Sequence, residues 1–160
     1  MARQLWLLRH GDAEPHGARA DFDRRLTERG RDEAVAAGRA LRALRVEFAS
    51  VLTSPKLRAA ETARLTAAAW AGTVQERPLL AGGLTAPDAL DLLAEEDADA
   101  RLLLVGHDPD LSRTVGDLTG ARIDLKKGGL AVVRAHGPGG ELIRLLRPSD
   151  LRLIAGEAQA

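Results

Sequence analysis

The sequence has no cysteine, no tyrosine, only two tryptophans and two phenylalanines, and no excess of charge of either sign. The absence of cysteine excludes disulfides, thiolate nucleophiles and zinc–thiolate sites. Scarce aromatic side chains exclude a stacking surface for single-stranded nucleic acid, and 23 basic residues against 23 acidic ones give no field that attracts nucleic acid or an acidic membrane. The apolar run Leu-Trp-Leu-Leu at residues 5–8 is too short for a signal peptide or a membrane span. We therefore expect a cytoplasmic protein whose partners are neither nucleic acid nor membrane.

What the sequence does contain is apolar runs of strand length that alternate with longer segments of helical period. This alternation and the length of 160 residues predict one domain over residues 1–160. The expected fold is a three-layer α/β/α sandwich around a central mixed, mostly parallel sheet. Its last two strands flank a short Gly/Pro-rich loop and should form a hairpin. Strands are expected at residues 4–8, 50–53, 74–79, 102–105, 130–134 and 142–146.

Helix starts are marked by capping residues. Thr27 precedes a long amphipathic segment, and a weaker helix is expected over residues 87–95. Ser54 and Asp108 are each followed by proline, which predicts a cap with proline in the first helical position. On that interpretation Arg58 is the fourth residue of its helix. Its side chain, leaning toward the helix N-terminus, would reach back over the strand ends.

Unusual residues follow three of the predicted strands. Arg9, His10 and Gly11 follow the first strand, Arg58 follows the second after a short turn, and His107 follows the fourth. In open α/β sheets, ligands bind where strand carboxyl ends and helix N-termini meet. Two guanidinium forks are suited to phosphate oxygens. The sequence therefore predicts an anion site, most consistent with a phosphoryl group.

Positive neighbours disfavour the imidazolium form, so a histidine placed among them should be neutral at pH 7. A neutral imidazole whose other nitrogen donates to a backbone carbonyl can attack phosphorus. We expect this role for His10, while His107 would hydrogen-bond the transferring group. Gly11 would let the backbone approach the ligand and offer it a free N–H.

These residues resemble the histidine phosphatase superfamily, which is phosphoglycerate mutase-like in fold, and within it the small SixA-type phosphohistidine phosphatases. The resemblance covers residues 5–133 and implies that His10 forms a covalent phosphohistidine that water hydrolyses. It implies that Arg9, Arg58 and His107 bind the phosphate, and that neither a metal nor another cofactor is required. The matching motifs are LRHGDA at residues 8–13, LTERG at 26–30, TSPKLRA at 53–59, ETA at 61–63 and VGH at 105–107.

Larger members of that superfamily carry a glutamate acid after the third strand. Residues 78–85 contain no carboxylate, so an alkoxide leaving group would lack a proton donor there. A phosphohistidine on a protein needs none, because its imidazole can leave already protonated. The leading hypothesis is therefore a metal-independent phosphohistidine phosphatase acting on a phosphorylated protein. The alternatives are a phosphatase of a small phosphorylated metabolite or nucleotide, a metallohydrolase with ligands from His10-x-Asp12 and His107-Asp108, and a phospho-ligand binder without turnover.

Several residues have two interpretations. Ser54 is a helix cap or a phosphate contact, and Asp108 a helix cap or a proton donor. Asp12 is structural, or donates a proton or positions water, and Lys127 belongs to a solvated loop or overhangs the pocket. His16 and His136 lie in Gly/Pro-rich loops and are expected to be exposed and inert.

Overall fold

The computed structural model describes residues 2–157 and contains one six-stranded sheet in the order β3-β2-β4-β1-β5-β6. Strands β1 to β4 are parallel to one another, β5 runs antiparallel to β1, and β6 pairs antiparallel with β5. The mixed, mostly parallel sheet confirms the predicted fold class. The strands are β1 (Gln4–Arg9), β2 (Ser50–Thr53), β3 (Gln75–Glu76), β4 (Arg101–Gly106), β5 (Leu130–His136) and β6 (Gly139–Leu146).

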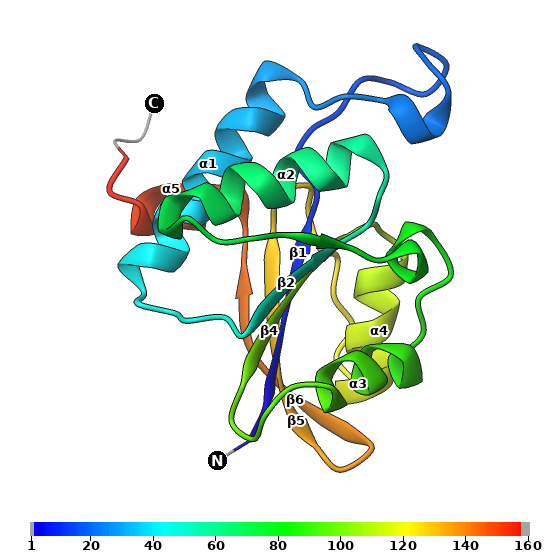
Figure 1. Ribbon diagram of the computed structural model, residues 1–160, viewed down its shortest axis with the longest axis vertical. Coiled ribbons are helices and arrows are strands. Elements are labelled where there is room, and N and C mark those ends of the chain that lie inside the picture. Colours follow the sequence, from blue (N-terminus) through cyan, green and yellow to red (C-terminus); the bar gives the residue numbers. More distant parts are fainter. Residues whose placement is uncertain (1, 158–160) are drawn as a thin grey trace.

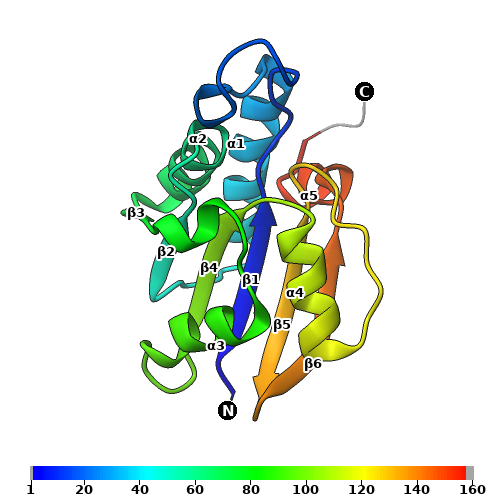
Figure 2. The same cartoon turned by 90° about the vertical axis from the view of Figure 1, so that its right-hand side faces the viewer.

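Helices cover both faces of the sheet, as Figures 1 and 2 show. One face carries α1 (Glu28–Ala43), α2 (Leu57–Ala67) and α5 (Pro148–Ile154). The other carries α3 (Ala86–Ala94) and α4 (Asp110–Thr119). Short 3-10 helices lie at Asp21–Asp23, Ala68–Trp70 and Pro78–Ala81. No helix among residues 2–157 is both long and apolar enough to cross a membrane.

The alternation of side chains along each strand divides the hydrophobic core into two layers. In β1, Leu5 and Leu7 pack with α3 and α4, whereas Trp6 and Leu8 pack with α1, α2 and α5. All four side chains are buried, which explains why the central strands have continuous apolar runs rather than alternating ones.

The chain leaves β1 toward one face of the sheet and leaves β4 toward the other. β1 leads to α1, and its neighbour β4 leads to α4 on the opposite face. Two adjacent parallel strands whose helices diverge in this way leave a crevice at their carboxyl ends, where ligands bind in open α/β sheets. Arg9 and Gly106 are paired in register at these two ends.

Several predicted boundaries are wrong. The strand expected over residues 74–79 is only Gln75–Glu76, and Pro78, which has no N–H for a ladder, begins a 3-10 turn. Helix α2 begins at Leu57, two residues after the predicted start at Pro55, and α4 begins at Asp110, one residue after the predicted start at Pro109. Arg58 is therefore the second residue of its helix and not the fourth. Helix α5 was not predicted.

Candidate active site

A cavity of about 190 Å³ lies at the carboxyl ends of β1 and β4. The parallel ladder continues one step beyond the strands, because the His10 N–H donates to the Gly106 carbonyl at 3.1 Å. This places the residues that follow the two strands, His10 and His107, on either side of one opening. The cavity is lined by Arg9, His10, Ala13, Glu14, Pro15, His16, Arg24, Arg58, His107, Asp108 and Lys127.

His10 is oriented by a hydrogen bond to the backbone. Its Nδ1 lies 2.7 Å from the carbonyl oxygen of Gly11, and the ring is buried. A carbonyl oxygen only accepts, so Nδ1 carries the proton and the lone pair resides on Nε2. Burial, together with the cations of Arg58, Arg9 and Lys127, lowers the pKa of His10 to about 3. The neutral imidazole at pH 7 therefore has a nucleophilic nitrogen.

His107 faces the first imidazole from β4. The two ring centroids are 5.3 Å apart and tilted by 56°. Nε2 of His107 lies 2.7 Å from Ser54 Oγ, which itself accepts the Lys56 N–H at 3.1 Å. When Ser54 donates its proton to Nε2, Nδ1 of His107 is the protonated nitrogen, and this buried atom has no partner in the described chain. Burial and the neighbouring imidazole lower the pKa of His107 to about 3.

Two guanidiniums complete the group. Arg9 ends β1 and donates from Nη1 to the Leu125 carbonyl at 2.9 Å. Arg58 is buried and donates from Nη1 to the backbone carbonyl of Asp21 at 2.8 Å. The buried Nε of each arginine has no hydrogen-bond partner within residues 2–157. Each therefore keeps donor capacity for an oxyanion, and the four residues predicted from three strand ends are brought together.

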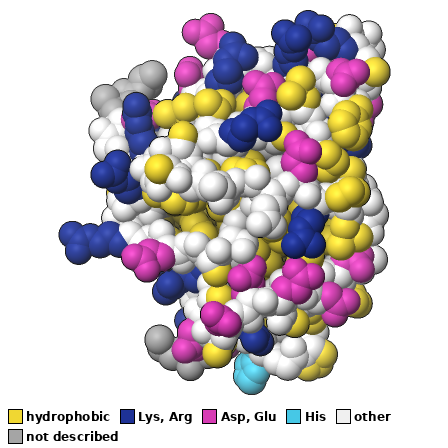
Figure 3. All heavy atoms as spheres, viewed as in Figure 1, with side chains coloured by type: hydrophobic (Ala, Val, Ile, Leu, Met, Phe, Trp, Pro, Cys, Tyr) yellow, Lys and Arg dark blue, Asp and Glu magenta, His cyan; other side chains and the backbone are white. Residues whose placement is uncertain are grey.

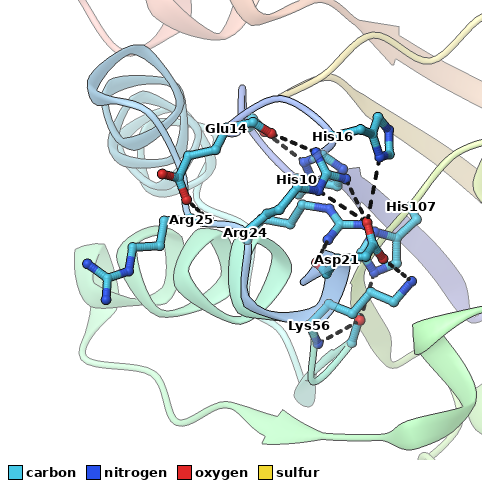
Figure 4. A network of polar contacts seen from close by, with 11 residues as sticks. His10, Glu14, His16, Asp21, Arg24, Arg25, Lys56 and His107 are labelled. Atoms are coloured by element: carbon cyan, nitrogen blue, oxygen red, sulfur yellow. Dashed lines mark hydrogen bonds and ion pairs between the residues drawn. The ribbon is translucent and has the colours of Figure 1, made fainter. Parts of the chain in front are cut away.

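A cluster that the sequence did not predict surrounds Arg58. The Asp21 carboxylate lies 3.0 Å from Lys56 Nζ, 3.0 Å from Arg24 Nη2 and 3.5 Å from Arg58 Nη2. Arg24 is buried and also donates to the Glu14 carbonyl at 2.7 Å. Figure 4 shows the Asp21 carboxylate with Arg24 and Lys56. Hydrogen bonding by Lys56 holds the pKa of Asp21 well below its usual range, because it favours the ionised form.

Arg24 belongs to the candidate site, and the sequence analysis missed it. It sits in the loop between β1 and α1, where no periodic pattern or cap fixes the direction of a side chain. The only available signal was its position inside the matched region, just before LTERG. Its place on the cavity wall depends on the path of the loop, which only the tertiary structure supplies.

The prediction that Gly11 offers a free N–H to the ligand was wrong. Its N–H is not free but donates to Thr62 Oγ1 at 3.2 Å. A Cβ at this position would stand 2.5 Å from the Gly30 carbonyl oxygen, and one at Gly30 would meet the carbonyl of Asp12. Gly11 is therefore required where the segment after β1 crosses the start of α1.

Ser54 and Asp108 are not N-caps of the observed helices. Ser54 is fully buried and links Lys56 N–H to His107, so its hydroxyl supports the site rather than a helix start. The Asp108 carboxylate accepts both the backbone N–H and the hydroxyl of Ser112, at 3.0 and 2.6 Å, within the first turn of α4. Asp108 lines the cavity while its carboxylate is engaged by the helix.

Asp12 does not line the cavity around His10. Its carboxylate accepts the Thr27 hydroxyl at 2.8 Å and lies 3.5 Å from Lys127 Nζ, while its N–H donates to Glu33. Asp12 therefore fastens the β1–α1 connection, and Lys127 is the residue that reaches the cavity. His16 and His136 are exposed as expected, although His16 lies at the cavity rim, 3.9 Å from Asp21.

The metal-ligand alternative needs imidazoles and carboxylates to converge. Within residues 2–157 no three His, Asp or Glu side chains are placed to hold a metal ion. The carboxylates of Asp12 and Asp108, which that alternative required, are directed to Thr27 and Ser112.

Comparisons with known proteins agree with this geometry. Residues 5–82 match the model of the histidine phosphatase superfamily, branch 1. An uncharacterized protein of Picosynechococcus sp. is 35% identical over 143 residues, which cover 82% of this chain and 85% of that protein. The solved structure of the protein histidine phosphatase SixA complexed with tungstate has a TM-score of 0.82 at 26% identity, covering 92% of this chain and 99% of that one.

A more distant structure shares the fold alone. The phosphoserine phosphatase of Entamoeba histolytica, solved with 3-phosphoglyceric acid, has a TM-score of 0.74 at 16% identity, over 93% of this chain and 99% of that one. The matched family model ends before β4, whereas the structural similarity covers 92% of this chain. With its sequence match and its paired imidazoles at the sheet edge, this chain belongs to the histidine phosphatase superfamily.

Proposed function

We propose that this chain is a metal-independent phosphohistidine phosphatase that acts on a phosphorylated protein through a covalent phospho-His10 intermediate. One observation carries the proposal. Nδ1 of His10 is held 2.7 Å from a carbonyl oxygen while cations surround the ring, so Nε2 is free and unprotonated. The likeness to the SixA structure supports the choice of substrate class.

In the first step the Nε2 lone pair of His10 attacks phosphorus, forming a P–N bond as the substrate's own P–N bond breaks. The departing electron pair goes to the substrate imidazole, which leaves as a neutral ring when its other nitrogen is already protonated. Arg9, Arg58 and the Nδ1–H of His107 donate to the phosphoryl oxygens. Preorganised donors of this kind provide most of the catalysis in phosphoryl transfer.

In the second step water attacks the phosphorus of phospho-His10. The P–Nε2 bond breaks, its electron pair returns to Nε2, and the protons of water go to phosphate and solvent. His10 is thus regenerated as the neutral imidazole. Because positive side chains hold the phosphoryl oxygens throughout, a divalent cation has no required role in either step.

The carboxylates around the cavity favour a leaving group that needs no acid. The pKa of Asp21 and that of Glu14 are both lowered, Asp21 chiefly by its hydrogen bond from Lys56 and Glu14 chiefly by the backbone N–H of Arg25. Asp108 is occupied as an acceptor by Ser112. Asp21 and Glu14 are therefore poor proton donors, and the Asp108 carboxylate is directed to Ser112, which disfavours an alkoxide leaving group and favours imidazole.

A substrate panel tests the proposal. We expect kcat/KM for a phosphohistidine-bearing protein domain to exceed that for small phosphomonoesters, with no change on adding EDTA. Efficient hydrolysis of a phosphosugar or nucleotide with little action on phosphohistidine would instead assign a small-metabolite phosphatase. Tight phosphate binding without hydrolysis of any substrate would identify a binding protein.

A further inference from the structure

A second, larger pocket of about 550 Å³ adjoins the cavity around His10. It lies between the start of α1, the loop before β5 and the start of α5. Arg9 and Lys127 line both hollows, so the two share a wall. Its volume is within the range of ligand-binding sites and exceeds what one phosphoryl group needs. It is lined by Arg9, Asp12, Arg29, Glu33, Lys126, Lys127, Arg147, Pro148, Ser149 and Arg152.

The lining is strongly basic, and its two carboxylates are already engaged. Asp12 accepts from Thr27 and pairs with Lys127, and Glu33 accepts the Asp12 N–H at 2.9 Å. Glu33 is buried, and burial raises its pKa, which Arg29 and Arg152 oppose. Two carboxylates against six basic side chains leave the lining with an excess of positive charge.

Four of the six basic side chains form no direct ion pair within residues 2–157. Of the six, Lys127 pairs with Asp12, and Lys126 lies 2.6 Å from the exposed Asp124, which also faces Arg9 and Arg147. The side-chain nitrogens of the remaining four have no carboxylate oxygen within 4.0 Å in residues 2–157: these are Arg9, Arg29, Arg147 and Arg152. The Asp150 carboxylate accepts the backbone N–H of Arg147 at 2.8 Å.

This concentration of charge is local. The chain as a whole has equal numbers of basic and acidic residues, and on the face shown in Figure 3 side chains of both signs lie among one another. Arg29, Lys126 and Arg147 are exposed, so the pocket is accessible to groups on another molecule. Guanidiniums are opposite in charge to carboxylates, and their paired N–H groups fit the two carboxylate oxygens.

We propose that this basic pocket docks acidic side chains that flank the phosphorylated histidine of the protein substrate. The inference rests on the proposed function and adds a determinant of specificity to it. The cations come from four places in the fold: the end of β1, the start of α1, the loop before β5, and α5 with its N-cap. This spread is wider than one carboxylate and suits several acidic side chains on one protein surface. The shared wall at Arg9 and Lys127 places those groups next to the transferring phosphoryl group.

Two phosphohistidine peptides test this inference: one with Asp and Glu around the phosphorylated residue, the other with Asn and Gln at the same positions. The variant is R29Q/R147Q, which changes two exposed arginines of the pocket. The matched control is R64Q/R134Q, which changes two exposed arginines outside both hollows. Phosphoramidate serves as the small substrate, because it carries no flanking groups.

The wild-type protein should prefer the acidic peptide by about tenfold in kcat/KM, and the preference should decrease as salt is added. R29Q/R147Q should lose the preference while keeping wild-type activity on phosphoramidate, and R64Q/R134Q should behave as wild type. Turnover of both peptides at equal rates, or a preference that survives in R29Q/R147Q, would overturn the docking inference and leave the phosphatase proposal intact. Failure of the wild-type protein to hydrolyse either peptide would overturn both.

Discussion

The imidazoles of His10 and His107 lie 5.3 Å apart between ring centroids because β1 and β4 are paired in parallel with Arg9 opposite Gly106. The sheet register alone places the next residue of each strand beside the other. Since α1 and α4 leave on opposite faces, no helix start blocks the space between them. The two histidines are thus positioned by the most buried part of the fold, which gives the site a rigid base.

Replacement of the proposed nucleophile is the first test. His10→Ala removes Nε2, and we expect loss of turnover of phosphohistidine by at least about a thousandfold, as for other covalent nucleophiles. The control is His136→Ala, which changes an exposed imidazole in the β5–β6 hairpin and should keep wild-type kcat/KM. Steady-state rates and rapid-quench detection of acid-labile phosphate measure both. Residual turnover in His10→Ala with acid-labile phosphate elsewhere would identify another nucleophile.

Arg24 should act through Asp21 and Arg58. Arg24→Met removes a buried guanidinium that donates to the Asp21 carboxylate and the Glu14 carbonyl. We expect about a tenfold lower kcat/KM, mainly through KM, since the oxyanion donors lose their alignment while His10 is retained. Arg25→Met is the matched control, because Arg25 is next to Arg24 in the sequence but its side chain is exposed and does not line the cavity. Equal kinetics for the two variants would show that Arg24 has no role in the site.

Gly11 tests the packing argument rather than the chemistry. In Gly11→Ala the added Cβ would stand 2.5 Å from the Gly30 carbonyl oxygen, and backbone cannot move aside cheaply. We expect the free energy of unfolding to fall by about 2 kcal/mol or more, the scale of overpacked interiors. Gly82→Ala is the control, since no atom lies within 4 Å of its Cβ position and its φ of 170 is extended. Urea denaturation compares them, and equal stability of the two variants contradicts the packing account.

The lowered histidine pKa values predict how stability depends on pH. The unfolded chain protonates these histidines near pH 6.5, whereas the folded chain does so only near pH 3. Between these values the unfolded state binds more protons, so stability decreases as pH falls from 6.5 toward 3. The limiting slope is about 1.4 kcal/mol per pH unit for each histidine.

Denaturation of the wild type and of His10→Gln at pH 6.5 and 4.5 measures that slope. We expect the variant to lose less stability on acidification, because one buried imidazole no longer titrates. The exposed His136→Gln variant should keep the wild-type dependence. Parallel curves for the wild type and His10→Gln would show that His10 is protonated in the folded protein near its ordinary pKa.

The residues at the ends of β1 and β4 were predictable because these strands carry unbroken apolar runs. Such runs mark central strands buried on both faces, and the residues just beyond them lie at the sheet edge. Arg58 was placed correctly near the site although its helix begins later than expected. The placement of the Arg58 side chain depends mainly on where β2 ends and on the short turn that follows. It depends less on the position of the residue within α2.

Features set by tertiary contacts were not predictable. The capping interpretation of Ser54 followed a valid local preference, but a hydrogen bond to His107 from a distant strand outweighs it. Gly11 was expected to contact a ligand because a sequence shows only that glycine is conformationally permissive. It does not show that the backbone of Gly30 lies against Gly11. Helix α5 is short, and it is held by packing on α1 rather than by a strong periodic signal.

The most direct test of the account is a crystal structure of the protein soaked with tungstate or vanadate. We predict one oxyanion in the 190 Å³ cavity, with its central atom next to His10 Nε2 and its oxygens accepting from Arg9, Arg58 and His107. An ion held without His10 and His107, or these side chains turned away from a bound ion, would contradict the assignment.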